Sequence, residues 1–304
     1  MARMEPVRMA VVGAGRMGRT HLRTLRHAVG VEAVAAVDPV DAVRDELERD
    51  GLRTWSTADE LLAAGGFDAV LIAAPTDLHL GLVTRFAAAG LPILCEKPCG
   101  VHADETSQAV RAAADADVLL QVGYWRRFVP ALIAVRERLL AGAYGAPLLV
   151  SCWQWDAQPP PASFRGRSGG ILLDMGVHEF DQLRWLTGRE IDHIAAFATA
   201  PDADSATALV QLDDGTAAVV SLGRMFPHGD CCWVELMGTS GHVRELFVWG
   251  EDGARVFEDA LVAQAEAFAG AVRGERPRGA TGEDAIRAIE AANCAARSLA
   301  ASHG

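Results

Sequence analysis

Residues 11–18 decide the fold, and they read Val11-Val12-Gly13-Ala14-Gly15-Arg16-Met17-Gly18. The stretch is a GxGxxG pattern that follows an apolar run and opens a segment with helical spacing. The first glycine permits a tight turn, the second lets the backbone approach a pyrophosphate, and the third allows the helix to pack closely on the strand. Because glycine turns also occur for purely structural reasons, the surrounding residues have to decide between the two interpretations.

Asp38 stands at the end of the second apolar run, at the spacing from the glycines that a dinucleotide-binding fold requires. A carboxylate there accepts hydrogen bonds from the adenosine ribose hydroxyls. The alternative is a solvated turn aspartate, which the following Pro39 favours. Since an anionic side chain repels a 2′-phosphate, the sequence favours NAD over NADP, although Arg44 is near enough in sequence to fold back.

Short apolar runs alternate with amphipathic segments over the first part of the chain. The runs that predict strands cover residues 7–12, 31–37, 68–73, 93–95 and 118–122, and those that predict helices include 41–49 and 78–89. Strands joined by crossover helices form parallel sheets. Residues 1–123 are therefore expected to form an α/β, Rossmann-type domain with a doubly wound parallel sheet.

The pattern changes after Gly123. Helical spacing at 127–140 leads into an apolar run at 148–155, and strand-like runs then follow one another from 191 to 248. Turns such as Asp213-Asp214-Gly215 suit neighbouring antiparallel strands. With two amphipathic helices at 259–273 and 283–301, residues 124–304 are expected to form a second, α+β domain.

The composition excludes several classes of protein. Twenty-eight basic and forty acidic residues give a net charge of −12, which repels the phosphate backbone of nucleic acids. No uninterrupted apolar stretch approaches the roughly 20 residues of a membrane helix, and the N-terminus lacks an apolar segment of secretory type. We expect a cytoplasmic protein without a membrane partner. Its six cysteines have no CxxC spacing and predict reduced thiols.

Two motifs follow predicted strands at the edge of the sheet where ligands bind in doubly wound folds. They are Ala74-Pro75-Thr76 with His79, and Glu96-Lys97-Pro98. We expect Ala74, Pro75, Thr76, His79, Glu96 and Lys97 to contact the cofactor, together with Arg16 and Met17 of the glycine turn. Pro98 restricts the backbone of Lys97 to extended conformations, which helps to aim its ammonium group. Without this position, a Glu–Lys pair is typically a solvated surface pair.

A further cluster reads Ser168-Gly169-Gly170-Ile171-Leu172-Leu173-Asp174-Met175-Gly176-Val177-His178-Glu179-Phe180-Asp181. In a helix, Asp174, His178 and Asp181 share one face as a polar stripe on an apolar element. The structural alternatives are a satisfied core histidine at 178 and an Asp181 that pairs with Arg184 or caps a neighbouring element. Aspartate and histidine also bind metals, but a dinucleotide explains hydride removal without one, so we assign no metal.

In their order along nearly the whole chain, these motifs resemble the glucose-fructose oxidoreductase/inositol dehydrogenase (Gfo/Idh/MocA) family, and its inositol dehydrogenases in particular. The resemblance rests on the glycine turn, Asp38, Glu96-Lys97-Pro98, Gly123-Tyr124 with Arg126-Arg127-Phe128, the block from Gly169 to Asp181, and residues 281–285. The sequence departs at Ser168, where many relatives carry a third glycine, and at residues 154–156 and 159–161. These departures leave the substrate's identity open.

The resemblance implies a Rossmann domain followed by a substrate-binding domain on a large open sheet, with homodimers or homotetramers formed through that sheet. It implies an NAD(P)-dependent dehydrogenase acting on a secondary alcohol of a cyclic polyol or sugar, and it assigns Lys97, Asp174 and His178 to the catalytic triad. A histidine suits a base because its unperturbed pKa lies near working pH. Lys97 is then expected to stabilise the alkoxide, and Asp174 to orient the substrate and raise the basicity of the imidazole.

The walls of the polyol site are predicted from residue type alone. Aromatic and charged candidates are Tyr124, Arg126, Trp155, Arg165 and Asp181. Trp153 and Trp155 lie two apart and hence on one face of a strand, so an interface between subunits is an alternative for them.

Other functions stay open at this level. The same fold can oxidise an aldose at its anomeric carbon or reduce a keto sugar or inosose. A non-catalytic NAD-binding sensor belongs to a different class, but it has no need for a base beside the nicotinamide. A lyase or glycosidase that uses NAD transiently is the third alternative, and it forms product without net NADH.

Overall fold

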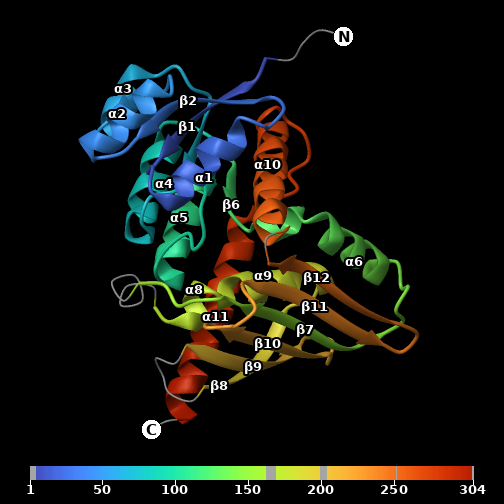
Figure 1. Cartoon of the computed structure of the whole chain (residues 1–304). Coiled ribbons are helices and arrows are strands. Elements are labelled where there is room, and N and C mark those ends of the chain that lie inside the picture. Colours follow the sequence, from blue (N-terminus) through green and yellow to red (C-terminus); the bar gives the residue numbers. More distant parts are fainter. Residues whose placement is uncertain (1–4, 162–168, 199–203, 251, 303–304) are drawn as a thin grey trace. The chain divides into compact units, whose positions relative to one another are not determined.

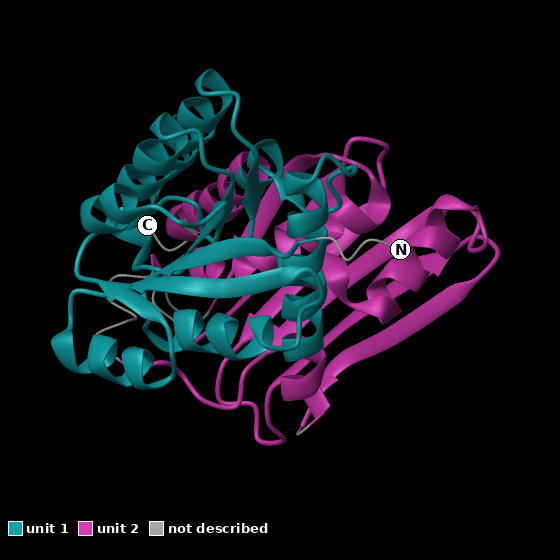
Figure 2. Cartoon of the chain, turned by 90° about the horizontal axis from the view of Figure 1, so that it is seen from above, with its two compact units in different colours: residues 1–125, 258–285 teal, residues 126–257, 286–304 magenta. Residues whose placement is uncertain are grey.

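The computed structural model describes residues 5–161, 169–198, 204–250 and 252–302 (Figure 1). The chain divides into two compact units, coloured separately in Figure 2. Unit 1 comprises Met1–Trp125 and Glu258–Ala285, and unit 2 comprises Arg126–Phe257 and Ile286–Gly304.

Unit 1 is built on a seven-stranded sheet of order β13-β6-β5-β4-β1-β2-β3. Its strands are β1 (Val7–Val12), β2 (Val31–Val37), β3 (Arg53–Trp55), β4 (Ala69–Ile72), β5 (Ile93–Cys95), β6 (Leu120–Val122) and β13 (Ala280–Thr281). All pairs are parallel except β13 with β6. The predicted doubly wound parallel sheet is confirmed, and the strand order reverses at β1, next to β4, where ligands bind in such sheets.

Helices connect these strands. They are α1 (Arg16–Leu25), α2 (Asp41–Arg49), α3 (Ala58–Ala64), η1 (Thr76–Leu78), α4 (His79–Ala88) and α5 (Ala103–Asp115). Thr57 begins α3 with a capping box, because its hydroxyl accepts from the Glu60 N–H while the Glu60 carboxylate accepts from the Thr57 N–H. On α1, the buried face carries Gly18, Leu22 and Leu25, which explains its orientation on the sheet.

Most of helix α10 (Asp252–Val272), from Glu258 onward, belongs to unit 1. Phe268 is fully buried in the core cluster that also holds Leu22 and Leu25 of α1. Glu258 pairs with Arg23 at 2.6 Å, and Glu266 accepts the Val29 N–H at 2.7 Å. The sequence predicted one second domain over residues 124–304. In the structure, Glu258–Ala285 belongs to unit 1 because α10 completes the core of that unit.

Unit 2 is built on a six-stranded sheet of order β12-β11-β7-β10-β9-β8. Its strands are β7 (Pro147–Trp155), β8 (Ile191–Phe197), β9 (Ser205–Leu212), β10 (Ala217–Gly223), β11 (Cys231–Gly238) and β12 (His242–Trp249), and its helical segments are η2 (Trp125–Phe128), α6 (Pro130–Leu140), α8 (Ile171–Asp174), α9 (Gly176–Thr187) and the greater part of α11 (Gly282–Ser302). Only β7 and β10 pair in parallel. The expected second, mainly antiparallel sheet is confirmed.

One face of this sheet packs on helices. Residues at even positions, such as Cys152, Val220 and Leu222, are buried, and Leu222 lies 3.3 Å from the position that a Cβ at Gly176 of α9 would take. Side chains alternate between the two faces of a strand. The odd positions of β7, β10 and β11 therefore form the opposite face.

The helix predicted across Asp174, His178 and Asp181 is not continuous. Helix α8 ends at Asp174, Met175 separates the two segments, and α9 begins at Gly176. At the break the His178 N–H donates to the Met175 carbonyl, which is a tighter turn than an α-helix makes. The predicted single helix is thus interrupted at one residue, although Met175 keeps right-handed helical dihedrals: Asp174 belongs to one short helix, and His178 and Asp181 belong to the next.

Candidate active site

The glycine turn joins β1 to α1 with little room behind it. A Cβ at Gly13, whose φ is +90°, would lie 2.6 Å from the backbone of Ala74, and a Cβ at Gly18 would lie 1.9 Å from the Gly13 carbonyl oxygen. A Cβ at Gly15 would meet no atom within 4 Å. The turn is thus closed on the protein side and open above Gly15, which fits a pyrophosphate at the N-terminus of α1. Arg16 is exposed and Met17 half-buried at the start of that helix.

Asp38 closes the same turn from the end of β2. Its carboxylate accepts the Ala14 N–H at 2.9 Å and the Val40 N–H at 3.0 Å, and the residue is buried. Arg44 does fold back, but its guanidinium donates to the Asp38 carbonyl oxygen at 2.8 Å and pairs with the Asp41 carboxylate. The carboxylate therefore stands beside the glycine turn, while the charge of Arg44 is matched by an acidic neighbour.

The two motifs at the sheet edge are connected through His79. Its ring nitrogens lie 2.8 Å from the carbonyl oxygens of Ala74 and Pro98, and the residue is buried. Pro75 is exposed and Thr76 half-buried at the start of η1. The imidazole thus connects the loop after β4 to the loop after β5; in the sheet order β4 lies next to β1, and β5 lies next to β4.

Glu96 is buried, and its carboxylate contacts protein groups on both sides. One oxygen lies 2.7 Å from Nε2 of His21, and the other accepts the backbone N–H of Lys97 at 3.2 Å. Lys97 is half-buried and precedes a cis peptide bond to Pro98. Sequence reasoning missed His21, although a histidine on the apolar face of α1 is itself a signal.

In unit 2, Asp174 is held by a cation that sequence reasoning also missed. Arg224, just after β10, donates to the Asp174 carboxylate at 2.7 Å and to that of Asp204 at 3.2 Å. Its own backbone N–H donates to the Asp204 carbonyl oxygen at 2.8 Å. A charged residue that ends an apolar strand was the available signal. Arg224 keeps Asp174 in position as a hydrogen-bond acceptor.

His178 lies on α9 and is buried.

Asp156 is a second carboxyl group near Asp174 in unit 2. Burial raises the pKa of Asp156, and the charges of Asp230 and Asp174 raise it further, while the hydrogen bond from the Gln154 amide lowers it. Asp156 therefore holds its proton to higher pH than an ordinary aspartate.

Two residues predicted to contact substrate take part in buried ion pairs. Arg126 pairs with Glu179 of α9 and donates to Gln154 at 2.7 Å. Asp181 accepts from Nη2 and Nε of Arg127 at 2.6 and 3.0 Å. The predicted partner Arg184 pairs with Glu190. These contacts join η2 to α9 and give Arg126 and Asp181 structural partners.

The other predicted wall residues lie in different places. Tyr124 is buried in unit 1 just after β6. Trp155 has the strand register of Trp153, on the sheet face opposite α9, and its indole N–H donates to Ser221 at 3.2 Å. Arg165 lies outside the described residues. Tyr124 and Trp155 thus belong to different compact units.

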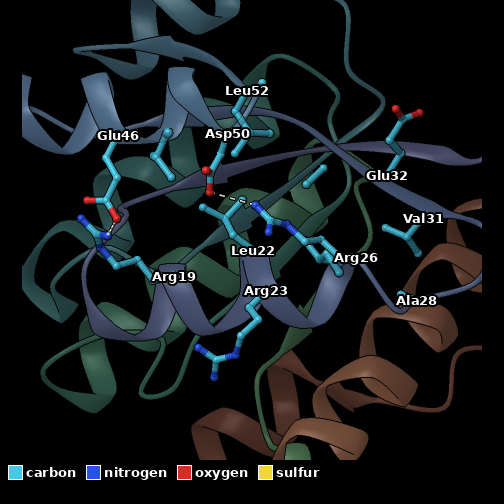
Figure 3. A pocket seen from close by; sticks show the side chains of 14 residues that line it. Arg19, Leu22, Arg23, Arg26, Ala28, Val31, Glu32, Glu46, Asp50 and Leu52 are labelled. Atoms are coloured by element: carbon cyan, nitrogen blue, oxygen red, sulfur yellow. Dashed lines mark hydrogen bonds and ion pairs between the residues drawn. The ribbon is translucent and has the colours of Figure 1, made fainter.

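A pocket in unit 1 lies between α1, α2 and β2 (Figure 3). Its arginines are paired: Arg19 lies 2.5 Å from Glu46, Arg26 lies 2.9 Å from Asp50, and Arg23 pairs with Glu258 at 2.6 Å. Figure 3 shows Arg19 and Arg26 directed to their partners. Because its charges are matched and no residue of the glycine turn lines it, we do not assign chemistry to this pocket.

Within residues 5–161, 169–198, 204–250 and 252–302, no group of three or more histidine, cysteine or acidic side chains is arranged to hold a metal ion. None of the helices in those ranges combines the length and apolar character that crossing a bilayer requires.

A glycine turn at the switch point of a doubly wound sheet, with an acidic residue closing it, defines a dinucleotide-binding protein. Comparison with protein families gives the same class and extends it. Residues 7–124 match the model described as oxidoreductase family, NAD-binding Rossmann fold, and residues 132–244 match the GFO/IDH/MocA C-terminal domain. The chain belongs to the Gfo/Idh/MocA oxidoreductase family, as its motifs predicted.

Individual relatives cover nearly the whole chain. A rhizopine catabolism protein MocA from Rhizobium meliloti is 48% identical, over 97% of this chain and 96% of that protein. An inositol 2-dehydrogenase from Rhizobium meliloti strain 1021 is 30% identical, over 97% of both. Among solved structures, a scyllo-inositol dehydrogenase from Lactobacillus casei, with bound NAD(H) and scyllo-inositol, is 25% identical and superposes with a TM-score of 0.89 over 98% of each chain.

Proposed function

We propose that this oxidoreductase is an NAD-dependent dehydrogenase that oxidises a secondary alcohol of an inositol-like cyclic polyol. The observation that carries the proposal is the complete set Lys97, Asp174 and His178, with Asp174 anchored by Arg224. Inositol dehydrogenases among the relatives support the substrate class.

The residues of this chain divide the work. The nicotinamide, when bound, supplies the hydride acceptor. His178 takes the proton of the alcohol, and Lys97 donates a hydrogen bond to the oxygen that becomes negative. Asp174, held by Arg224, accepts a hydrogen bond that orients the substrate or the imidazole. Asp181 and Arg126, through their pairs with Arg127 and Glu179, position α9 and with it His178.

A panel of substrates tests the proposed activity. Purified protein is incubated with NAD and each of several inositols, rhizopine and common aldoses, and NADH is followed by absorbance; rhizopine is included because of the relative that is named for it. We expect turnover with a cyclic polyol above all aldoses. Turnover only with aldoses contradicts the substrate class, product without net NADH indicates a lyase or glycosidase, and tight NAD binding without any turnover indicates a sensor.

NAD rather than NADP is the proposed cofactor, because the Asp38 carboxylate beside the glycine turn would repel a 2′-phosphate and the charge of Arg44 is matched by Asp41. Asp38→Ala is expected to raise the Kd of NAD about tenfold or more, since hydrogen bonds to a charged group contribute about 1.5–3 kcal/mol. The Kd of NADP should rise less or fall, because the repulsion is gone. Titration of both cofactors by fluorescence measures the ratio; an equal loss for both would show that Asp38 only supports the turn.

We also propose that two copies associate through the open face of the unit 2 sheet. One row across this face runs Leu246, Trp233, Trp153, Ser221, Thr207 and Phe197. Trp153 stacks on Trp233 with ring centroids 5.0 Å apart, and its buried indole N–H has no partner among the described residues. Aromatic residues are enriched in such interfaces.

Leu209→Glu tests this association. Leu209 is 52% exposed on the same face, two positions from Thr207. A charge at the centre of an apolar interface is expected to shift the protein to monomer in sedimentation velocity. The matched control is Leu140→Glu, at a 54% exposed leucine that ends α6, and it should leave the sedimentation coefficient unchanged. A wild-type protein that sediments as a monomer contradicts the proposal.

A further inference from the structure

A buried histidine and a buried carboxylate lie behind Lys97 in unit 1. His21 is 2% exposed on α1, the helix that begins at the glycine turn, and Glu96 is 9% exposed directly after β5. Nε2 of His21 lies 2.7 Å from Oε1 of Glu96. Buried polar groups need hydrogen-bond partners, and these two side chains provide one for each other. The contact is therefore part of the core.

The protonation states of Glu96 and of Nε2 of His21 follow from their surroundings. Burial alone would raise the pKa of Glu96, but the hydrogen bond and charge of His21, with the charge of Lys97, lower it below its usual value. Glu96 is therefore ionised at neutral pH. Since a carboxylate only accepts hydrogen bonds, Nε2 of His21 must carry the proton that it donates.

The second oxygen of Glu96 reaches Lys97 itself. Oε2 accepts the backbone N–H of Lys97 at 3.2 Å. A Cβ at Gly123 would lie 3.2 Å from Oε2, so the chain at the end of β6 packs directly against the carboxylate. One residue further, the Pro98 carbonyl oxygen lies 2.8 Å from Nδ1 of His79. The backbone that carries the Lys97 side chain is thus held at both ends by buried groups.

We propose that Glu96, held by His21, is a positioning residue for Lys97: the carboxylate couples the helix of the glycine turn to the backbone of Lys97 and so fixes where its ammonium group stands. Neither side chain takes part in proton transfer. The inference rests on the proposed function only in that it takes Lys97 to act on the substrate oxygen. Glu96, which the sequence predicted as a cofactor contact, thus also positions Lys97, and His21 holds the Glu96 carboxylate in place.

The first test is a comparison of Glu96→Gln in two backgrounds. In the wild-type background, kcat is expected to fall about 10- to 100-fold, because a misplacement of about 1 Å costs on the order of that factor. KM for the polyol and Kd for NAD should stay within about twofold. In the Lys97→Ala background, Glu96→Gln should change kcat less than about twofold, because effects on one unit are not additive.

Three outcomes overturn the proposal. They are an unchanged kcat in Glu96→Gln, the same fractional loss of kcat with and without Lys97, and a loss that lies in the Kd of NAD. A Lys97→Ala enzyme with normal turnover instead contradicts the proposed function, so the two failures are distinguishable.

A pair of His21 variants distinguishes loss of the hydrogen bond from misfolding. His21→Leu removes the donor and should lower kcat as Glu96→Gln does, whereas His21→Gln retains an N–H donor and should recover most of the activity. The matched control is Arg26→Gln, which breaks the exposed pair with Asp50 on the same helix and should leave kcat unchanged. Equal activity of His21→Leu and His21→Gln contradicts the role of the donor.

Hydrogen exchange tests how the Lys97 backbone is held without measuring turnover. Amide hydrogen exchange of the peptide that contains Lys97 should be about tenfold faster in Glu96→Gln than in wild type, because the acceptor of the Lys97 N–H is weakened. Exchange in α5 should not change. Wild-type exchange at Lys97 in the variant would show that the carboxylate does not hold this backbone.

Discussion

His178→Asn is expected to lower kcat about 10³-fold, while KM for the polyol changes little. A positioned general base contributes roughly 10² to 10⁴ in rate, and asparagine keeps a polar side chain on α9 without a group that titrates near neutral pH. Lys97→Ala should cost about 10² to 10³, the range found when one donor to a developing oxyanion is removed. Steady-state kinetics with the preferred polyol of the panel measure both.

The control for this prediction is His193→Asn. His193 lies on β8 with a side chain that is 75% exposed and pairs with Asp192, so its loss should leave kcat unchanged. Turnover above about a tenth of wild type in His178→Asn would remove His178 from the role of base. Circular dichroism of the variant distinguishes lost chemistry from lost structure.

Asp181→Ala is expected to destabilise the protein by about 3–5 kcal/mol, the cost of leaving one member of a buried ion pair without its partner. The side chains of Arg127 and Asp181 are only 7% and 2% exposed and share two hydrogen bonds. Urea denaturation measures the change in the free energy of unfolding. The double variant Arg127→Met/Asp181→Leu should recover most of it, because neither charge is then buried alone.

An exposed pair provides the comparison for Asp181. Asp192→Ala breaks the contact with His193, where both side chains are more than half exposed, and should cost less than about 1 kcal/mol. If Asp181 instead bound a substrate hydroxyl, Asp181→Ala would raise KM without loss of stability. That result would restore it to the polyol site and contradict its structural role.

Local patterns predicted much of the fold. The glycine turn, β1 and β2 have the bounds expected from the sequence, because a buried parallel strand reads as a continuous apolar run. The short β3 and β13, with three and two residues, were missed. Such strands are too short to show a period, and they exist because a neighbouring strand offers its edge.

The break between α8 and α9 shows a second limit. The spacing of Asp174, His178 and Asp181 suits one helix, but Gly176 weakens a helix interior and was a visible warning. A Cβ at Gly176 would lie 3.3 Å from Leu222 of β10, so the close approach of α9 to the sheet favours glycine at this position. The spacing of residues in the sequence cannot predict contacts between a helix and a distant strand.

The partners of the charged groups were the least predictable feature. Arg224 meets Asp174 across fifty positions of sequence, and Asp181 takes Arg127 rather than Arg184. A single sequence shows which residues carry charge but not which charges the fold brings together. The residue types of the candidate site were therefore predictable, while the network that holds them was not.

The late return of α10 has a consequence for how the chain acquires its structure during synthesis. Leu22 and Leu25 emerge from the ribosome long before Phe268, with which they share a core. N-terminal domains generally fold first as they are made, but here the apolar surface of Leu22 and Leu25 stays uncovered until Phe268, more than two hundred residues after Leu25, has been translated. Completion of the core beneath the glycine turn is thereby tied to translation of α10.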